Sequence, residues 1–186
     1  MKYLWLLRHG KAVADAPGGD RERPLAARGR SDATALGRRL DAGQGVFGLA
    51  NVPVPRVIVC SSAVRTRQTA ELVNGAMGDR LPLDAFRSLY GASTQTTLRV
   101  VRELDDDVDS ALVVGHNPTM YQLAWELVAP VPGEEVDEEV EGDDRSVLRT
   151  HGFPTCALAV VALEVSWWEA VADGVGSLAG LFRPPY

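Results

Sequence analysis

Three short apolar runs, each followed at once by basic or titratable residues, constrain the fold of this 186-residue chain more than any other feature. The runs span 3–7, 56–60 and 111–114, and helix-like segments separate them. Apolar runs of this length without alternation are typical of strands that are buried on both faces. Strands that alternate with helices predict an α/β fold, a three-layer sandwich in which helices cover both faces of a mostly parallel central sheet.

The rest of the chain is expected to supply the covering helices and the outer strands. Ser61 and Ser62 are predicted to cap the second helix, because serine hydroxyls accept hydrogen bonds from the first free amides of a helix. Trp167 and Trp168 point to opposite sides of the strand predicted for them, so one of them belongs to the core. The tail from 178 onward ends in prolines and is not expected to continue a regular element for long. We predict helices at 24–40, 63–77, 94–104 and 119–128, loops at 13–20 and 43–55, an irregular segment or short strand at 81–90, and strands at 155–164 and 166–170.

Length and composition fit one domain that spans residues 1–186. Hydrophobic residues make up 46% of the chain and charged residues 24%, which is the usual balance for a globular protein with a core. The sequence contains no run of 18 apolar residues, and the first apolar run is too short for a signal peptide. We therefore expect a cytoplasmic protein with no membrane span. Cys60 and Cys156 lie far apart in strand-like runs and are expected to be buried, reduced thiols.

The net charge of −6 comes from one acidic segment. Eight acidic residues and no basic residue lie between Glu134 and Asp144, whereas the other 17 acids nearly balance the 19 bases. Together with its prolines and glycines, this composition predicts an exposed, flexible insertion at about 130–150. No basic stripe with interleaved aromatic residues is present, so nucleic-acid binding is not expected.

The residues that follow the three apolar runs predict a phosphate site. Arg8 and His9 follow the first run, Arg65 lies just after the second, and His116 follows the third. Because the carboxyl ends of parallel strands line the ligand crevice of such sheets, these side chains are expected to converge. Arginine forks match the oxygens of a phosphoryl group, and a helix N-terminus adds amide donors and a favourable dipole.

Two histidines among arginines indicate nucleophilic catalysis. Neighbouring positive charge lowers the pKa of an imidazole, so that one histidine can attack phosphorus while the second donates to a phosphoryl oxygen. Gly10 and Gly115, beside the histidines, are expected to allow close approach of the backbone. No metal-binding cluster is recognisable in the sequence, and neither a metal nor another cofactor is expected.

These motifs together resemble those of the histidine phosphatase superfamily. The resemblance implies a phosphoglycerate mutase-like fold, a phosphorylated intermediate on His9, and a phosphate pocket completed by Arg8, Arg65 and His116. The matching elements are Leu7-Arg8-His9-Gly10-Lys11-Ala12, Ser61-x-Ala63-x-Arg65-x-x-Gln68-Thr69-Ala70, Val114-Gly115-His116-Asn117-Pro118 and Phe153-Pro154-Thr155.

Within the superfamily, the short length and the motif Asp20-x-x-Arg23-Pro24-Leu25 resemble the SixA-type phosphohistidine phosphatases. This resemblance implies that Arg23 reaches toward the phosphate, and Ser61 and Gly10 are also expected to lie near it. Phosphoglycerate mutases carry a proton-donating glutamate that is missing here, where the stretch reads Arg87-Ser88-Leu89-Tyr90-Gly91.

The missing glutamate bears on the substrate. An alkoxide leaving group needs a general acid, whereas the P–N bond of phosphohistidine breaks more readily. We therefore expect a metal-independent phosphatase that acts on phosphohistidine in a protein. A small-molecule phosphomonoesterase remains open, since Asp84, Glu103 or another carboxylate could fold into reach, and so does a non-catalytic phosphate-binding module. The partner is then a phosphorylated protein or a small phosphorylated molecule, and the sequence leaves the oligomeric state open.

Overall fold

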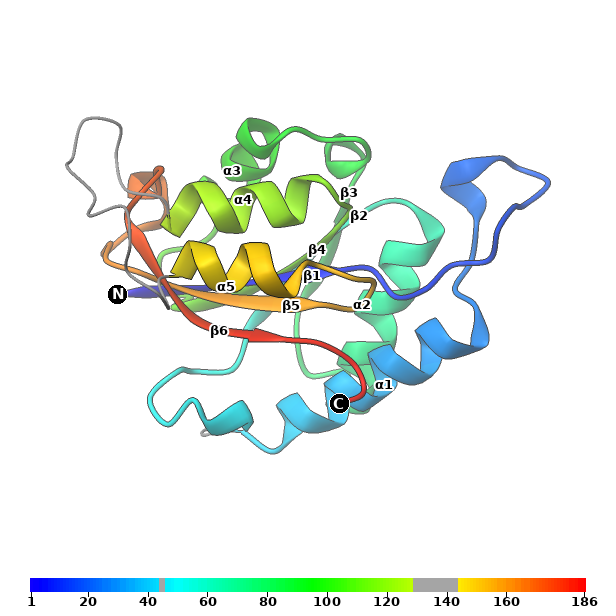
Figure 1. The fold of residues 1–186 in the computed structure, drawn as a ribbon, viewed down its shortest axis with the longest axis horizontal. Coiled ribbons are helices and arrows are strands. Elements are labelled where there is room, and N and C mark those ends of the chain that lie inside the picture. Colours follow the sequence, from blue (N-terminus) through cyan, green and yellow to red (C-terminus); the bar gives the residue numbers. More distant parts are fainter. Residues whose placement is uncertain (44–45, 129–143) are drawn as a thin grey trace.

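The computed structural model describes residues 1–43, 46–128 and 144–186, and it is built around one six-stranded sheet (Figure 1). The strand order is β3-β2-β4-β1-β5-β6. The first four strands in this order are parallel, and the last two run antiparallel to their neighbours. The sheet is therefore mixed and mostly parallel, as predicted. The strands are β1 (Lys2–Arg8), β2 (Val57–Ser61), β3 (Leu83–Phe86), β4 (Ser110–Gly115), β5 (Leu158–Leu163) and β6 (Gly176–Phe182).

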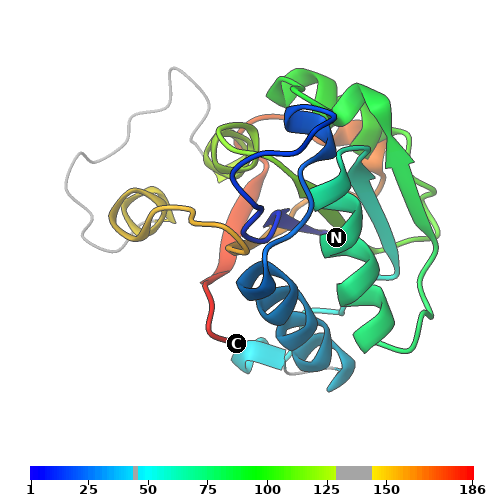
Figure 2. The ribbon, with the colours of Figure 1, turned by 90° about the vertical axis from the view of Figure 1, so that its right-hand side faces the viewer.

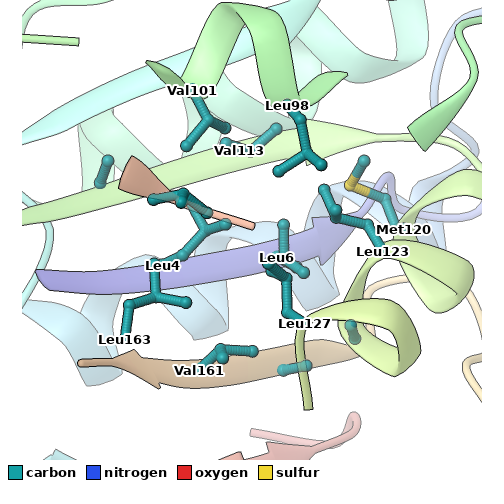
Figure 3. Packing of buried hydrophobic residues seen from close by; sticks show 14 of the residues in the cluster. Leu4, Leu6, Leu98, Val101, Val113, Met120, Leu123, Leu127, Val161 and Leu163 are labelled. Carbon is teal, nitrogen blue, oxygen red and sulfur yellow. The ribbon is translucent and has the colours of Figure 1, made fainter. Parts of the chain in front are cut away.

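Helices cover both faces of this sheet, and alternate residues of β1 pack against them. Leu4 and Leu6 face the helices α3 and α4, where they meet Leu98 and Leu123 (Figure 3). Trp5 faces the other way, into a second core formed with α1 and α2. Figure 1 shows α3 and α4 on one side of the sheet and α1 on the other. The helices are α1 (Ala27–Asp41), α2 (Val64–Ala76), α3 (Thr94–Arg102), α4 (Thr119–Val128) and α5 (Asp144–His151).

The predicted strand at 166–170 is wrong. This segment is a 3₁₀ turn at Trp168–Ala170, and the sixth strand is β6, which was not predicted and ends at Phe182 before the prolines of the tail. Trp168 is fully buried, and its indole Nε1–H donates to the carbonyl oxygen of Val108 at 2.8 Å, which anchors the turn to the segment before β4. Trp167 is 58% exposed, so one tryptophan of the pair belongs to the core, as expected. The strand β6 is specified by its antiparallel pairing with β5 rather than by local propensity.

The predicted insertion at about 130–150 is partly helical. Residues 144–151 form α5, and Leu148 of this helix is fully buried in the core that contains α4. The carboxyl-terminal part of this segment therefore packs on the core as a helix. Residues 129–143, which hold most of the acidic segment, lie outside the described residues. Within the described ranges, no helix is long and apolar enough to span a membrane.

Two glycines let the loop after β1 lie directly against α1. A Cβ atom on Gly10 would lie 2.8 Å from the carbonyl oxygen of Gly29, and one on Gly29 would lie 2.2 Å from the carbonyl oxygen of Lys11. Both distances are far shorter than any normal carbon–oxygen contact, and the neighbouring atoms belong to the backbone. This close approach fixes where the chain runs as it leaves the carboxyl end of β1, the edge that Figure 2 turns toward the viewer.

We predict that Gly29→Ala lowers the free energy of unfolding by about 1–3 kcal/mol, because the added methyl group forces the loop away from α1. Gly75→Ala is the matched control, since its Cβ meets only a side-chain oxygen at 3.6 Å. Alanine is the better helix former, so this control should be neutral or stabilising by up to about 1 kcal/mol. Urea denaturation of both variants measures the difference. Equal stability of the two variants would show that the backbone contact is unimportant.

Candidate active site

The two histidines meet because β1 and β4 are neighbouring parallel strands that end at the same level. Arg8 pairs in register with Gly115, and the amide of His9 donates to the carbonyl oxygen of Gly115 at 3.0 Å. His9 directly follows Arg8 at the end of β1, and His116 directly follows Gly115 at the end of β4. Their ring centroids lie 5.1 Å apart, with an angle of 63° between the ring planes.

His9 is held as a neutral imidazole with a free ring nitrogen. Its Nδ1 lies 2.7 Å from the carbonyl oxygen of Gly10, which can only accept, so the ring proton sits on Nδ1 and Nε2 keeps its lone pair. The side chain is buried, and burial lowers the pKa of His9 to about 3, assisted by the charges of His116, Arg65 and Arg8. The bond to the Gly10 carbonyl opposes this shift. At neutral pH the ring is therefore unprotonated at Nε2 and nucleophilic.

His116 is neutral as well, with the opposite tautomer. Its Nδ1 lies 3.4 Å from a terminal nitrogen of Arg65, which can only donate, so Nδ1 is the acceptor. Its Nε2–H then donates to Oγ of Ser61 at 2.9 Å. Burial, assisted by the charges of Arg65 and Arg8 and opposed by Asp20, lowers the pKa of His116 to about 4.

The guanidinium groups of Arg8 and Arg65 lie near the histidines, and each has a hydrogen-bond donor that no described residue accepts. Nη1 of Arg8 donates to the carbonyl oxygen of Phe153 at 2.9 Å, which orients this side chain at the end of β1. The Nε atoms of Arg8, Arg65 and Arg21 are all buried and, among the described residues, have no hydrogen-bond partner. A buried donor without a partner costs free energy unless a ligand satisfies it. An anion that binds here would satisfy such donors. The cluster of His9, His116, Arg8 and Arg65 is therefore a candidate phosphate-binding site.

Asp20 is a member of the cluster that the sequence analysis missed. Its Oδ2 accepts from Nη2 of Arg65 and from the hydroxyl of Tyr90, both at 2.9 Å, and its Oδ1 accepts from Arg23 at 2.9 Å. The Tyr90 hydroxyl, followed by Arg65, lowers the pKa of Asp20, so the carboxylate is ionised. Tyr90 was also missed, and its ring centroid lies 5.8 Å from that of His116.

The structure gives the predicted substrate-binding residues other contacts. Arg23 does not contact the histidines in any hydrogen bond of the structure; its Nε donates to the carbonyl oxygen of Val13, and it reaches Arg65 only through Asp20. The amide of Gly10 already donates to Oγ1 of Thr69 at 3.0 Å. This glycine is therefore required for packing against α1, and its amide is not free for a ligand.

The expectation that Ser61 and Ser62 cap α2 is wrong. The N-cap residue is Ala63, and no side chain caps the helix. The Oγ of Ser61 instead contacts His116, as described above, and the Oγ of Ser62 accepts from Arg21 at 3.0 Å. Both hydroxyls therefore form hydrogen bonds with basic side chains, of Arg21 and His116, rather than with the free amides of the helix.

Two carboxylates that the sequence left open lie elsewhere. Asp84 and Glu103 line a separate cavity of about 260 Å³, together with Val57 and Val59 at the beginning of β2. Neither contributes to the histidine–arginine cluster in the described hydrogen bonds. Over the ranges that the structure describes, no three His, Cys, Asp or Glu side chains gather as metal ligands. The cluster itself is dominated by arginines, which bind anions rather than metals.

Known proteins match both the sequence and the fold. Residues 4–90 match the model of the histidine phosphatase superfamily, branch 1. The uncharacterized protein Rv1276c of Mycobacterium tuberculosis is 31% identical over 180 residues, which cover 96% of this chain and 99% of the relative. A structure assigned as the phosphohistidine phosphatase SixA of Nakamurella multipartitia superposes with a TM-score of 0.74 at 27% identity and covers 100% of this chain and 97% of that one.

A second structure, assigned as SixA of Agrobacterium tumefaciens, gives a TM-score of 0.72 at 26% identity, with 98% of each chain covered. The match therefore extends beyond residue 90 to the whole sheet, including β4, β5 and β6. The fold predicted from the sequence is confirmed, and so is the resemblance drawn from the strand-end motifs. The chain belongs to branch 1 of the histidine phosphatase superfamily.

Proposed function

We propose that this protein is a metal-independent phosphatase that works through a phosphohistidine on His9 and takes phosphohistidine in a protein as its substrate. The observation that carries the proposal is the state of His9. It is a buried, neutral imidazole whose Nε2 lone pair is free, and it lies beside two guanidinium groups with unpaired Nε–H donors. A phosphoryl group bound by Arg8 and Arg65 would present its phosphorus to this nitrogen.

In the first step, Nε2 of His9 forms a bond to phosphorus as the P–N bond of the substrate breaks. The substrate reacts with its ring protonated at the second nitrogen, so its imidazole takes the bonding electron pair and departs neutral. The guanidinium groups of Arg8 and Arg65 balance the charge on the phosphoryl oxygens as the bond changes occur. No proton has to be supplied to the leaving group.

In the second step, a water oxygen forms a bond to phosphorus, and the bond to Nε2 of His9 breaks. The imidazole of His9 again departs neutral, because its proton has stayed on Nδ1, facing the carbonyl oxygen of Gly10. One proton of the attacking water passes to the phosphate that is released. The enzyme is thereby restored to its starting protonation state.

The charge of Asp20 favours a phosphoramidate substrate over a phosphate ester. An alkoxide leaving group needs a proton from a general acid near it. Asp20 is the carboxylate that the described structure places within hydrogen-bond distance of Arg65, and its pKa is lowered, so it holds no proton at neutral pH. The similarity to structures assigned as SixA phosphohistidine phosphatases supports the same choice.

A small-molecule phosphomonoesterase is the second candidate, and the observation that favours it is the position of Asp20, as distinct from its charge. Such an enzyme requires a carboxylate beside the phosphate site, and Asp20 is bound to Arg65 there. The non-catalytic phosphate-binding module gains no support of this kind, since binding alone would not require a neutral, buried nucleophile.

We predict that the protein releases phosphate from a phosphohistidine peptide far faster than from phosphoserine or a sugar phosphate. With the ³²P-labelled peptide, the protein should carry an acid-labile, base-stable label. His9→Ala should abolish the label and lower the rate on the order of 10³-fold or more, because the nucleophile is lost. His151→Ala, at the third histidine of the chain, is the control and should keep both. Preferred turnover of sugar phosphates would support the second candidate instead, and phosphate binding without turnover of any substrate would support the binding module.

The lowered histidine pKa values predict how stability depends on pH. The pKa falls from 6.5 to about 3 for His9 and to about 4 for His116 in the folded protein. Between about pH 4 and 6.5 the unfolded chain therefore binds more protons than the folded one, and the free energy of unfolding should decrease as the pH is lowered through this range.

Urea denaturation at several pH values from about 7 to about 4 measures this dependence. Replacing His9 and His116 by asparagine should make the free energy of unfolding less dependent on pH. The control His151→Asn should retain the pH dependence that comes from His9 and His116. If the double variant retained the full pH dependence of the natural protein, the two histidines would not be buried in the neutral form.

A further inference from the structure

Asp20 occupies both terminal nitrogens of Arg65. Nη1 of Arg65 donates to the backbone carbonyl oxygen of Asp20 at 2.6 Å, and Nη2 donates to its carboxylate at 2.9 Å. Both terminal nitrogens of this guanidinium are therefore bound to one residue. The side chain of Arg65 is only 8% exposed, so it has little freedom to present these donors in another direction.

The carboxylate of Asp20 is held from three directions. Besides Arg65 on α2, the hydroxyl of Tyr90 and the guanidinium of Arg23 each donate to it at 2.9 Å. One carboxylate oxygen and the backbone carbonyl oxygen of Asp20 occupy the two terminal nitrogens of Arg65, as two phosphoryl oxygens would. The side chain is nevertheless 52% exposed, so it can swing outward without opening the core.

We propose that Asp20 is a specificity-determining residue that competes with phosphate for Arg65 and so weakens the binding of free inorganic phosphate. An incoming phosphoryl group must displace the carboxylate or bind beside its negative charge, and either event reduces affinity. A phosphoryl group on a protein brings further contacts that offset this loss, whereas the released phosphate has none. The residue thus favours the substrate over the product, and this inference rests on the function proposed above.

The variant Asp20→Asn tests the competition because it removes the charge, keeps the shape and leaves the backbone contact to Arg65. Inorganic phosphate titrated into the protein in a calorimeter should bind about five- to tenfold more tightly to the variant, as expected for the loss of a partly exposed charge-assisted bond. Asp15→Asn removes a charge from an exposed position in the same loop and should bind phosphate like the natural protein. Asp20→Ser, which also lacks the carboxylate, should shift the affinity in the same direction as Asp20→Asn.

The titration separates the role of Asp20 from the proposed phosphatase activity. Equal phosphate affinity in the natural protein and in both Asp20 variants would overturn the role of Asp20 and leave the proposed phosphatase intact. Failure of the natural protein and the variants alike to bind phosphate would overturn both. As a second readout, inhibition of phosphohistidine hydrolysis by added phosphate should strengthen in Asp20→Asn by the same factor, and unchanged inhibition would contradict the proposal.

Discussion

The parallel pairing of β1 with β4 is the contact on which the candidate site depends. The ladder places Arg8 opposite Gly115, and one further bond, from the amide of His9 to the Gly115 carbonyl, continues it beyond the strands. A shift of one residue would turn every side chain of β1 to the other face of the sheet. Leu4 and Leu6 would then leave the core that they share with α3 and α4. The packing of the sheet therefore fixes the distance between the two imidazoles.

Burial gives this site its chemistry as well as its shape. Desolvation is the largest cause of the lowered pKa of both histidines, and the nearby arginines act in the same direction. Within the part of the chain that the structure describes, the same burial leaves the Nε–H groups of Arg8 and Arg65 without partners, at a cost in stability that a bound anion would remove. A phosphoryl group would thus meet an uncharged nucleophile and two positive donors at once. Each of these features would be weaker at a solvent-exposed position.

Features that a short segment encodes by itself could be predicted from the sequence. Features that depend on contacts between residues far apart in the chain could not. The strand-end histidines and arginines were predictable because a buried apolar run ends visibly at Arg8 and at Gly115. The contact of Asp20 was not, because its partners Arg65 and Tyr90 lie 45 and 70 residues away along the chain. For the same reason β6 was missed: glycine-rich sequence has little strand propensity, and only its pairing with β5 specifies the strand.

The arrangement of protons explains why such a site can work with arginines and without a proton donor. Transfer of a phosphoryl group from one imidazole to another leaves a neutral ring behind each time, provided that the second ring nitrogen keeps its proton. The carbonyl oxygen of Gly10 secures this condition for His9, since it holds the proton on Nδ1 throughout. An ionised carboxylate can therefore lie next to Arg65 without any catalytic loss, which would not hold for an enzyme that must protonate an alkoxide. The charge state of Asp20 and the tautomer of His9 thus both support the proposed substrate, whose leaving group is a nitrogen base.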